Sequence, residues 1–387
     1  MRVLHIINDL RVGGAERLLV DLAPRLRASG IELEVLTLAP RDSYLTGELR
    51  ASSVPLHDDP DAISLRSPRQ IGRIAGLLPA YDIVHVQLFP AQLWVAVASS
   101  GPSMPGKVRP KLVTTEQNTY NRRRKALYQP ADRWMYGRFD RIIAITSATA
   151  EALAEWVPST RDRTQVIHNA ADIARFANAV ALPRASLGVP PDSPLLACVG
   201  RLEPQKDQAT LVRMMPSLPG AHLALIGDGV LRSPLERQAE QLGVRDRIHF
   251  LGRRADVPEV LKACDVYIQP SRWEGFGIAV VEAMAAGVPV VCSDVPGMRD
   301  VTAEAALICP PGDVEAFALA VRRLLKDPDE RKRRADAGKA RAALFTMERC
   351  VAEHRALYES LMSPTWKSCD IRHDGNNYNV TVDNSGK

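Results

Sequence analysis

The chain has 387 residues, which is more than a single hydrophobic core usually organises, so two domains are expected. Hydrophobic residues make up 46% of it and charged residues 25%, a composition that argues against a disordered or coiled-coil protein. The formal net charge of +5 is small beside the clustered positive excess of nucleic-acid-binding proteins, so nucleic acid is not an expected partner.

The first half of the chain alternates short apolar runs with longer helical patterns. Val3–Ile7 predicts the first strand, and Glu16–Ser29 predicts the helix after it. Further strands, each with a helical segment behind it, are expected at Leu33–Leu38, Ile83–Val86, Lys111–Thr115 and Arg141–Ile145. Strands and helices that alternate in this way form a parallel sheet covered by helices.

The alternation pauses at a proline-rich segment, residues 172–194, which predicts a linker. It then restarts, with strands expected at Leu195–Val199, Leu223–Ile226, Ile248–Leu251, Val266–Ile268 and Val288–Cys292. Two such sets predict an α/β protein with two Rossmann-like domains that face each other across a cleft. Ligands of such sheets bind beyond the carboxyl ends of the strands.

The last part of the chain predicts successive helices up to about residue 362, followed by a polar segment rich in asparagine. We expect an N-terminal Rossmann-like domain over residues 1–180 and a C-terminal Rossmann-like domain over 181–345. A helix is expected over 346–362 and a poorly ordered tail over 363–387.

The cysteines and the N-terminus indicate the compartment. None of the six cysteines forms a Cys-x-x-Cys pair, so free thiols in a reducing cytosol are expected. The apolar stretch at the N-terminus is interrupted by Asn8, Asp9 and Arg11, which indicates a strand and not a signal peptide. No uninterrupted apolar segment of about 18 residues occurs. The sequence therefore favours a cytoplasmic protein.

The segment from Trp273 to Gly287 carries the strongest functional signal. A loop with Gly275 and Gly277 precedes a helix whose one charge is Glu282. The amides of the first helical turn form an anion site that these glycines open to a phosphate. A buried carboxylate needs a hydrogen-bonding partner, and the hydroxyl pair of a ribose would serve. The alternative is that Glu282 pairs internally with an arginine.

Two further loops follow predicted strands. The segment Val199–Asp207 carries Arg201 and Lys206, which suit a diphosphate through forked hydrogen bonds and a point charge, respectively. The alternative is that both are solvated loop charges. Gly13 and Gly14 allow close backbone approach at the start of a helix, or simply form a flexible turn. They do not complete the G-x-G-x-x-G pattern, which disfavours a nicotinamide-dependent oxidoreductase.

These motifs together resemble family 4 of the retaining glycosyltransferases, which have the GT-B fold. The resemblance rests on Glu274-x7-Glu282, on Gly-Arg-Leu-x-x-x-Lys at residues 200–206, and on Gly13-Gly14. It extends over roughly residues 1–360, and further matching stretches are Ile226–Gly229, Ile248–Gly252 and Cys309–Asp313. The pattern says little about which sugar is transferred.

The resemblance implies that the nucleotide of a nucleotide-sugar donor lies mainly on the second domain. Arg201 and Lys206 would bind its diphosphate, and Glu282 would accept the ribose hydroxyls. Glu274 would face the donor sugar. The final helix would cross back onto the first domain.

The same resemblance implies contacts with the main chain and the base. The backbone amides of Gly275, Phe276, Gly277 and Ile278 would contact the sugar and the phosphate. Arg253 lies in the segment where the family usually holds the base.

The sequence departs from the family pattern on the acceptor side. A histidine often follows the strand equivalent to Leu112–Thr115 and reaches the donor sugar, whereas Gln117 stands there in this chain. An amide can hydrogen-bond a hydroxyl but cannot share a proton as imidazole does. His85 is an alternative contact to the donor sugar, and a structural histidine is the other interpretation. Asp300 also stands where many members carry glutamate.

The expected chemistry needs neither a metal nor another cofactor beyond the nucleotide-sugar co-substrate. No Asp-x-Asp stands at a strand end in either half, and Arg201, Lys206 and the helix amides would stabilise the departing diphosphate. Retention in this family is attributed to attack on the same face of the sugar, with the leaving phosphate taking the acceptor's proton. Covalent attack by Glu274, as in retaining hydrolases, is the alternative.

A compact basic cluster, Arg122, Arg123, Arg124 and Lys125, lies in the first half of the chain and is followed by interleaved aromatic residues. A basic and aromatic helix suits a membrane surface or a diphosphate-lipid acceptor. We therefore expect peripheral contact with the inner face of the membrane through these cations. The alternative is a solvated helix face over an ordinary core.

The expected function is retaining transfer of a hexose-type sugar from a UDP- or GDP-sugar to a glycan, glycolipid or lipid-linked acceptor in bacterial surface polysaccharide synthesis. Three alternatives stay open: another GT-B enzyme such as an epimerase or a phosphorylase, a natural-product glycosyltransferase, and a non-catalytic binder of nucleotide sugars. No segment indicates the pyridoxal-phosphate lysine that a phosphorylase would need.

Overall fold

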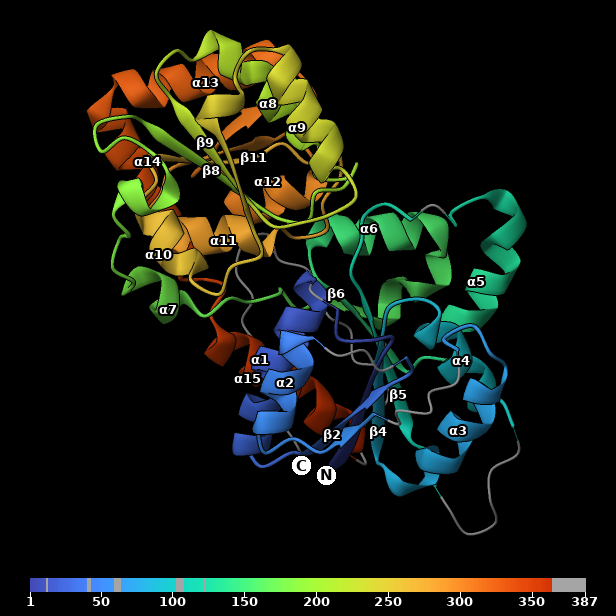
Figure 1. Cartoon of the computed structure of the whole chain (residues 1–387). Coiled ribbons are helices and arrows are strands. Elements are labelled where there is room, and N and C mark those ends of the chain that lie inside the picture. Colours follow the sequence, from blue (N-terminus) through green and yellow to red (C-terminus); the bar gives the residue numbers. More distant parts are fainter. Residues whose placement is uncertain (12, 40–42, 59–63, 102–107, 122, 364–387) are drawn as a thin grey trace, which may run out of the picture.

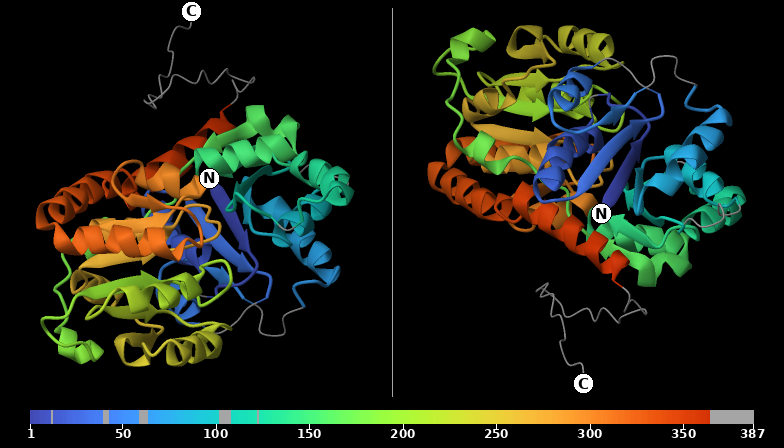
Figure 2. Two further views of the ribbon diagram at one scale, coloured as in Figure 1. Left: turned by 90° about the horizontal axis from the view of Figure 1, so that it is seen from above. Right: turned by 90° about the horizontal axis from the view of Figure 1, so that it is seen from below.

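The computed structural model describes residues 1–11, 13–39, 43–58, 64–101, 108–121 and 123–363. Two lobes lie one above the other in Figure 1, and each contains a parallel sheet surrounded by helices. Figure 2 shows the same two lobes from above and below. The predicted fold class, two Rossmann-like α/β domains, is confirmed.

The first sheet has seven parallel strands in the order β3-β2-β1-β4-β5-β6-β7. Their bounds are β1 Arg2–Ile7, β2 Glu32–Thr37, β3 Leu56–His57, β4 Ile83–Gln87, β5 Lys111–Glu116, β6 Arg141–Ala144 and β7 Thr164–Val166. The five strands predicted from apolar runs are present, and β3 and β7 at the two edges were missed. Strands of two and three residues are too short for a periodic pattern.

The helices of this lobe follow the strands. They are α1 Gly14–Ala28, α2 Tyr44–Ala51, α3 Arg69–Leu77, α4 Ala91–Ala98, α5 Gln129–Tyr136, α6 Ser147–Trp156 and the short linker helix α7 Ile173–Ala177. The Ser43, Thr146 and Asp172 side chains accept hydrogen bonds from the first turns of α2, α6 and α7. Such caps satisfy amides that have no partner inside the helix, so they fix where each helix begins.

The second sheet has six parallel strands in the order β10-β9-β8-β11-β12-β13. Its strands are β8 Leu195–Val199, β9 His222–Ile226, β10 Ile248–Gly252, β11 Val266–Gln269, β12 Val290–Ser293 and β13 Leu307–Cys309. Its helices are α8 Gln208–Met214, α9 Arg232–Gln241, α10 Val257–Lys262, α11 Ile278–Ala285, α12 Pro296–Thr302, α13 Val314–Lys326 and α14 Pro328–Ala342. We place the domain boundary at 180/181, within the segment that joins the two sheets.

The final helix, α15 Met347–Met362, returns to the first lobe and packs against α1. In Figure 1 it lies beside the blue helices of the first half of the chain. Its Tyr358 is buried in the core of that lobe, where the hydroxyl lies 2.6 Å from Nδ1 of His85 on β4. The core of the first lobe is therefore built from both ends of the chain.

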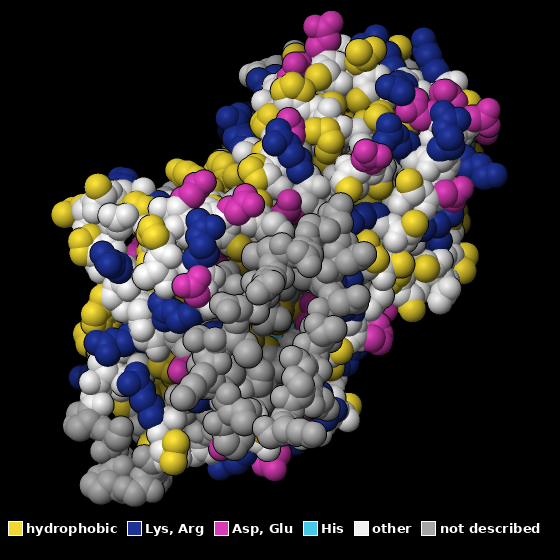
Figure 3. Space-filling view, turned by 180° about the vertical axis from the view of Figure 1, so that it is seen from behind, with side chains coloured by type: hydrophobic (Ala, Val, Ile, Leu, Met, Phe, Trp, Pro, Cys, Tyr) yellow, Lys and Arg dark blue, Asp and Glu magenta, His cyan; other side chains and the backbone are white. Residues whose placement is uncertain are grey.

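The surface carries charges of both signs. Seen from behind in Figure 3, Lys and Arg side chains are interspersed with Asp and Glu over both lobes, outside the residues drawn in grey. Five cysteines lie in the described part of the chain, and all five are free thiols. The sixth, Cys369, lies outside the described residues.

Candidate active site

The strand order of each sheet places the predicted functional loops at equivalent points. In each sheet the order reverses between two central strands, β1 and β4 in the first and β8 and β11 in the second. Loops beyond the carboxyl ends of strands at such a reversal line the ligand crevice of Rossmann-like folds. Gly13 and Gly14 follow β1, Arg201 and Lys206 follow β8, and the segment 273–278 follows β11.

The loops of the two lobes touch one another. A Cβ on Gly275 would lie 2.1 Å from the carbonyl oxygen of Gln117, so only glycine permits this approach of the two backbones. The Thr119 hydroxyl donates to the Glu274 carbonyl at 3.2 Å, and the Thr146 hydroxyl donates to the Gly275 carbonyl at 3.1 Å. The segment expected to hold the donor sugar is therefore fixed against the first lobe.

Lys206 and Glu274, which were assigned to different parts of the donor, form an ion pair. Lys206 Nζ lies 2.6 Å from Glu274 Oε2, and the Ser271 hydroxyl donates to the same oxygen at 3.2 Å. Ser271 in turn accepts a hydrogen bond from the Gln269 side chain at the end of β11. The Glu274 carboxylate is only 8% exposed, so this cation is its main compensation.

The start of α11 offers free hydrogen-bond donors beside this pair. Gly277 precedes the helix with φ of +85°, a conformation that favours glycine. Within the described part of the chain, the backbone amides of Gly277, Ile278 and Ala279 donate no hydrogen bond to protein groups. The Phe276 side chain is buried against Phe345, at 5.2 Å between ring centroids, which leaves its main chain for ligands. This geometry suits an anion.

The two arginines of this half are exposed. Arg201 has a side chain that is 53% exposed and pairs with Glu203 at 3.1 Å, so it can turn toward a ligand. Arg253 is exposed just after β10, and its side chain makes no hydrogen bond or ion pair with the described residues. The exposure of both side chains is compatible with binding of an anion by Arg201 and of a base by Arg253. Ordinary solvation of surface charges explains the same exposure equally well.

Glu282 is the charged group with the least compensation. Its carboxylate is half-buried on α11 and makes no hydrogen bond or ion pair with the described residues. Burial raises the pKa of Glu282 to about 7, and the charge of Arg175 is the largest influence that lowers it. The alternative of an internal ion pair therefore has no contact to support it among the described residues. A carboxylate left in this way needs hydroxyl or amide donors from elsewhere.

Gly13 and Gly14 lie across from α11. A Cβ on Gly14 would lie 3.4 Å from the Ile278 side chain of the other lobe, so this loop faces the anion site. The Glu16 carboxylate folds back over Gly13, so a side chain at residue 13 would have to displace this flexible group. Burial raises the pKa of Glu16, and Arg201 across the cleft opposes this effect.

Comparison with known sequences bears on this arrangement. The profile of "Glycosyltransferase Family 4" matches residues 12–175, and that of "Glycosyl transferases group 1" matches residues 182–341. A 2-deoxystreptamine N-acetyl-D-glucosaminyltransferase of Streptomyces fradiae is 30% identical over 303 residues, which cover 71% of this chain and 70% of that protein. The chain belongs to glycosyltransferase family 4. It is a retaining glycosyltransferase that uses a nucleotide-sugar donor.

Other similar proteins support the family and the fold. A lipopolysaccharide core biosynthesis glycosyltransferase, LpsE of Rhizobium meliloti, is 35% identical over 205 residues, which cover 51% of this chain and 58% of that protein. The Anabaena protein HepE, solved with UDP and glucose, superimposes with a TM-score of 0.81 at 24% identity, over 92% of this chain and 99% of that one. The glycosyltransferase therefore has the GT-B fold.

The acceptor side of the glycosyltransferase is lined by amides that bond to one another. Gln117 Nε2 donates to Gln87 Oε1 at 2.9 Å, and Asn169 Nδ2 donates to Gln117 Oε1 at 3.3 Å. Gln117 thus lies at the cleft, where the departure from the family pattern was noted. Gln87 and Asn169 were missed, although each is a polar residue just at or beyond the end of an apolar strand.

The suggested contact of His85 with the donor sugar needs correction. The His85 side chain has no exposed surface, and its two ring nitrogens lie 2.6 Å from the Tyr358 hydroxyl and 2.7 Å from the Thr115 hydroxyl. Burial lowers the pKa of His85 well below its usual value, so the ring is neutral. It is a structural histidine that joins β4 and β5 to α15.

The expected basic helix also needs correction. Arg122 lies outside the described residues, and Arg123 turns inward, pairing with Asp132 at 3.1 Å while its guanidinium lies 3.4 Å from the centroid of the Phe89 ring. Arg124 donates to the Thr119 carbonyl at 2.9 Å. Residues 123–125 lie in a loop, and α5 begins only at Gln129. Lys125 is the one exposed cation among the described members of the cluster.

Two contacts between the lobes had no signal in the sequence. The Asp300 carboxylate accepts a hydrogen bond from the Ala148 amide in the first turn of α6 at 2.8 Å. The Tyr120 and Trp273 rings lie 5.4 Å apart across the cleft. Both contacts join residues whose relation depends on how the lobes are arranged, which a linear pattern does not contain.

No group of three or more His, Cys, Asp or Glu side chains that could hold a metal ion occurs among the described residues. None of the helices in the described part of the chain is both long and apolar enough to cross a bilayer.

Proposed function

We propose that this glycosyltransferase transfers a sugar from a UDP- or GDP-sugar to a glycan, glycolipid or lipid-linked acceptor in bacterial surface polysaccharide synthesis. The observation that carries the proposal is the Lys206–Glu274 ion pair beside the free amides at the start of α11. A partly buried cation, unpartnered donors and a carboxylate together can neutralise a diphosphate and orient a sugar attached to it.

The proposed reaction follows from these groups. The bond between the anomeric carbon and the β-phosphate oxygen breaks, and Arg201, Lys206 and the α11 amides stabilise the charge on the leaving diphosphate. The acceptor oxygen forms its bond to the same face of the anomeric carbon, and its proton passes to the leaving phosphate. Glu274 is held by Lys206 and Ser271, an arrangement that suits orienting the sugar rather than attacking it.

The nucleoside half of the donor would bind at Glu282. Two ribose hydroxyls would supply the donors that this carboxylate lacks among the described residues. The Anabaena neighbour was solved with UDP, which supports testing UDP-sugars first. Arg253, exposed after β10, would lie beside the base.

A lipid-linked acceptor is supported by the exposed side chains around α5. Leu127, Tyr128 and Trp134 are 83%, 48% and 39% exposed, and Lys125 and Arg133 beside them are exposed cations. Apolar groups mixed with cations bind the interface of anionic membranes. The proposed membrane contact therefore uses Lys125 and the exposed aromatic and apolar groups, while Arg123 and Arg124 serve the loop. It would bring a cytoplasmic enzyme to the inner face of the membrane.

The test is release of the nucleotide. Thermal-shift measurements with UDP-, GDP- and ADP-sugars identify the donor, because a bound ligand stabilises the fold by mass action. That donor is then incubated with anionic vesicles that contain lipid-linked glycans. We expect UDP or GDP release that depends on the acceptor. Binding of a nucleotide sugar without turnover on any acceptor would instead indicate a non-catalytic binder.

A second candidate acceptor is a soluble aminocyclitol, which is favoured by the similarity to the 2-deoxystreptamine transferase over 70% of that protein. Turnover with 2-deoxystreptamine derivatives, and none with lipid-linked glycans, would favour it over the first proposal.

A further inference from the structure

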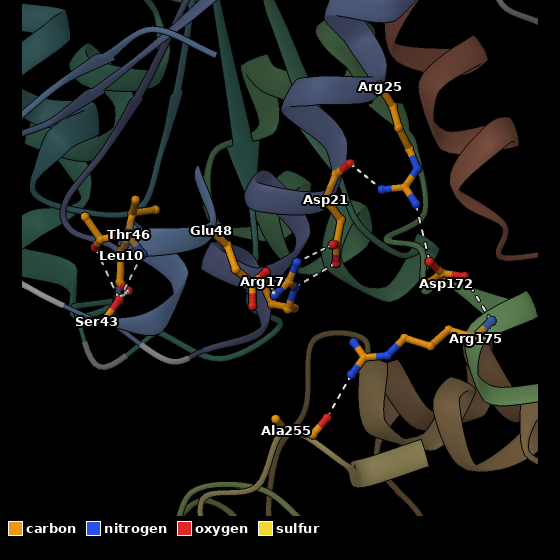
Figure 4. Close-up of polar contacts among 10 residues, drawn as sticks. All are labelled: Leu10, Arg17, Asp21, Arg25, Ser43, Thr46, Glu48, Asp172, Arg175 and Ala255. Carbon is orange, nitrogen blue, oxygen red and sulfur yellow. Dashed lines mark hydrogen bonds and ion pairs between the residues drawn. The ribbon is translucent and has the colours of Figure 1, made fainter. Parts of the chain in front are cut away.

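Arg175 links the segment between the two lobes to the nucleoside side of the cleft. It lies on α7, and Figure 4 shows its side chain reaching away from that helix to the Ala255 carbonyl. Arg175 Nη2 donates to this oxygen at 2.8 Å. Ala255 follows Arg253 in the loop after β10, so a residue of the linker holds the loop expected at the base.

The same helix lies against the ribose side of the proposed site. α7 packs against α11, which carries Glu282, and against α10, which follows the Ala255 loop. Arg175 is the strongest attractive charge acting on the Glu282 carboxylate, ahead of Arg17. The titratable and charged groups that influence this carboxylate are Arg175 from α7, Asp21 and Arg17 from α1, Tyr44 from α2 and Tyr267 from β11.

The other end of this arrangement reaches the first lobe (Figure 4). Asp172 Oδ1 accepts a hydrogen bond from the Arg175 backbone amide at 3.1 Å, and its Oδ2 lies 3.3 Å from Arg25 Nη2 on α1. Arg25 also donates to the Asp21 carbonyl at 2.7 Å. The Arg17 guanidinium joins the Asp21 side chain to Glu48 of α2. A continuous series of polar contacts thus runs from α2 to the Ala255 loop.

The ion pair and the hydrogen bond to a carbonyl in this series differ in how they affect stability and loop position. The Arg25–Asp172 pair is about 40% exposed on both sides, and such pairs contribute little to the free energy of folding. The Arg175 hydrogen bond to a carbonyl is directional and fixes the position of one loop. Its loss should therefore change what binds at that loop more than it changes the stability of the protein.

We propose that Arg175 is a positioning residue for the nucleoside half of the donor site, which holds the 253–255 loop through the Ala255 carbonyl and places a cation on the helix that packs against α11. The inference rests on the proposed function, because it takes Glu282 to be the ribose acceptor.

The chain offers a matched control in Arg184, another arginine of the linker segment. Arg184 donates to the Ala263 and Ser193 carbonyls at 3.1 and 2.7 Å and pairs with Asp265 at 2.9 Å. It makes contacts of the same kind, none of them with Glu282 or the loop at 253–255. Arg184→Gln should lower the melting temperature and leave UDP affinity unchanged.

The test is calorimetry of the full chain with UDP, or GDP if that is the nucleotide bound, at pH 6.5 and 8.5. Removing a cation raises the pKa of a nearby carboxylate, so less of Glu282 is ionised at pH 6.5 and the difference shrinks at pH 8.5. Arg175→Gln should raise the dissociation constant about tenfold at pH 6.5 and about threefold at pH 8.5 relative to the wild type. Arg175→Lys keeps the charge and should keep the wild-type pH dependence.

Titration of the nucleotide itself cancels in the ratio of variant to wild type. An unchanged UDP affinity in Arg175→Gln at both pH values would overturn the inference, as would a loss that is equal at the two values and matched by Arg184→Gln. If the wild type binds neither UDP nor GDP, the proposed function fails first. The two failures are therefore distinguishable.

Discussion

The two sides of the cleft differ in how their polar groups are partnered. On the C-terminal side, one partly buried cation pairs with one carboxylate, Glu282 has no partner among the described residues, and the amides at the start of α11 are free. On the N-terminal side, Gln87, Gln117 and Asn169 bond to one another, and His85 is fully satisfied in the core. The C-terminal side therefore lacks hydrogen-bonding partners that a ligand would supply, whereas the polar groups of the N-terminal side already have such partners within the protein.

This difference indicates how the binding energy is divided. Groups left uncompensated in a low-dielectric site interact strongly with the ligand that completes them, whereas a satisfied amide exchanges one hydrogen bond for another. We therefore expect substitutions on the C-terminal side to affect the donor strongly. Substitutions on the N-terminal side should cause smaller changes that are confined to transfer.

The largest effect is expected for Lys206→Ala. Loss of the cation that neutralises the leaving diphosphate should reduce the transfer rate by about 100- to 1000-fold. It also leaves the Glu274 carboxylate buried without its partner, so the melting temperature should fall. Rates and melting curves are compared with those of Glu274→Gln, which should also transfer slowly but bind UDP within about threefold of the wild type. A Lys206→Ala variant with unimpaired transfer would remove the basis of the comparison.

Glu282→Gln distinguishes an effect on nucleotide binding from an effect on the stability of the fold. UDP affinity should fall about 30- to 150-fold, the equivalent of about 2–3 kcal/mol, because a charged acceptor for ribose hydroxyls is lost. Free UDP should show this loss, since it contains the ribose.

The stability of the same variant should change in the opposite direction. The folded pKa of Glu282, about 7, lies above its unfolded value of 4.5, so the folded state binds more protons and ionisation destabilises it as pH rises through this range. Removing the charge should raise the free energy of unfolding at pH 8 by up to roughly 3 kcal/mol, and the gain should vanish toward pH 4.5. An internal ion-pair partner would give a lower melting temperature instead, with no selective loss of UDP binding.

A smaller effect is expected for Gln117→Ala on the N-terminal side. The substitution frees the side chains of Gln87 and Asn169, which can then bond to water or to the acceptor. Transfer should fall by only about three- to tenfold, and UDP affinity should not change. A loss as large as that of Lys206→Ala would show that the amide contacts the reacting sugar directly.

Chelation should have no effect. With Lys206 and the free amides at the phosphate position, EDTA should leave the transfer rate unchanged. Loss of activity that magnesium restores would show that the diphosphate is neutralised by a metal.

The comparison also explains what the sequence predicted. The functional residues of the C-terminal side lie in local motifs, such as the loop and helix from Trp273 to Gly287. Their charges are easy to recognise in the sequence because the neighbouring residues are apolar. The central strands of both Rossmann-like sheets follow from apolar runs in the same way, whereas the short edge strands β3, β7 and β13 do not.

The N-terminal side is assembled from residues far apart in sequence. Nothing local indicates that Gln117 would meet Asn169, or that Arg123 would turn toward Phe89 and Asp132. The Lys206–Glu274 pair was missed in the same way, although each residue was identified, because their contact depends on two loops of one sheet meeting. The Arg122–Lys125 segment had the composition of a surface helix, but inward pairing of two of its arginines determines its structure.

The return of α15 has a consequence for biosynthesis. The core of the first lobe includes Leu357, Tyr358 and Leu361, and Tyr358 bonds to His85 across 273 positions of sequence. Domains usually complete folding in the order in which they leave the ribosome. Here the first lobe to be synthesised stays unfinished, with the face of α1 uncovered, until α15 emerges. The second lobe, which needs no later segment for its sheet, can close before the first.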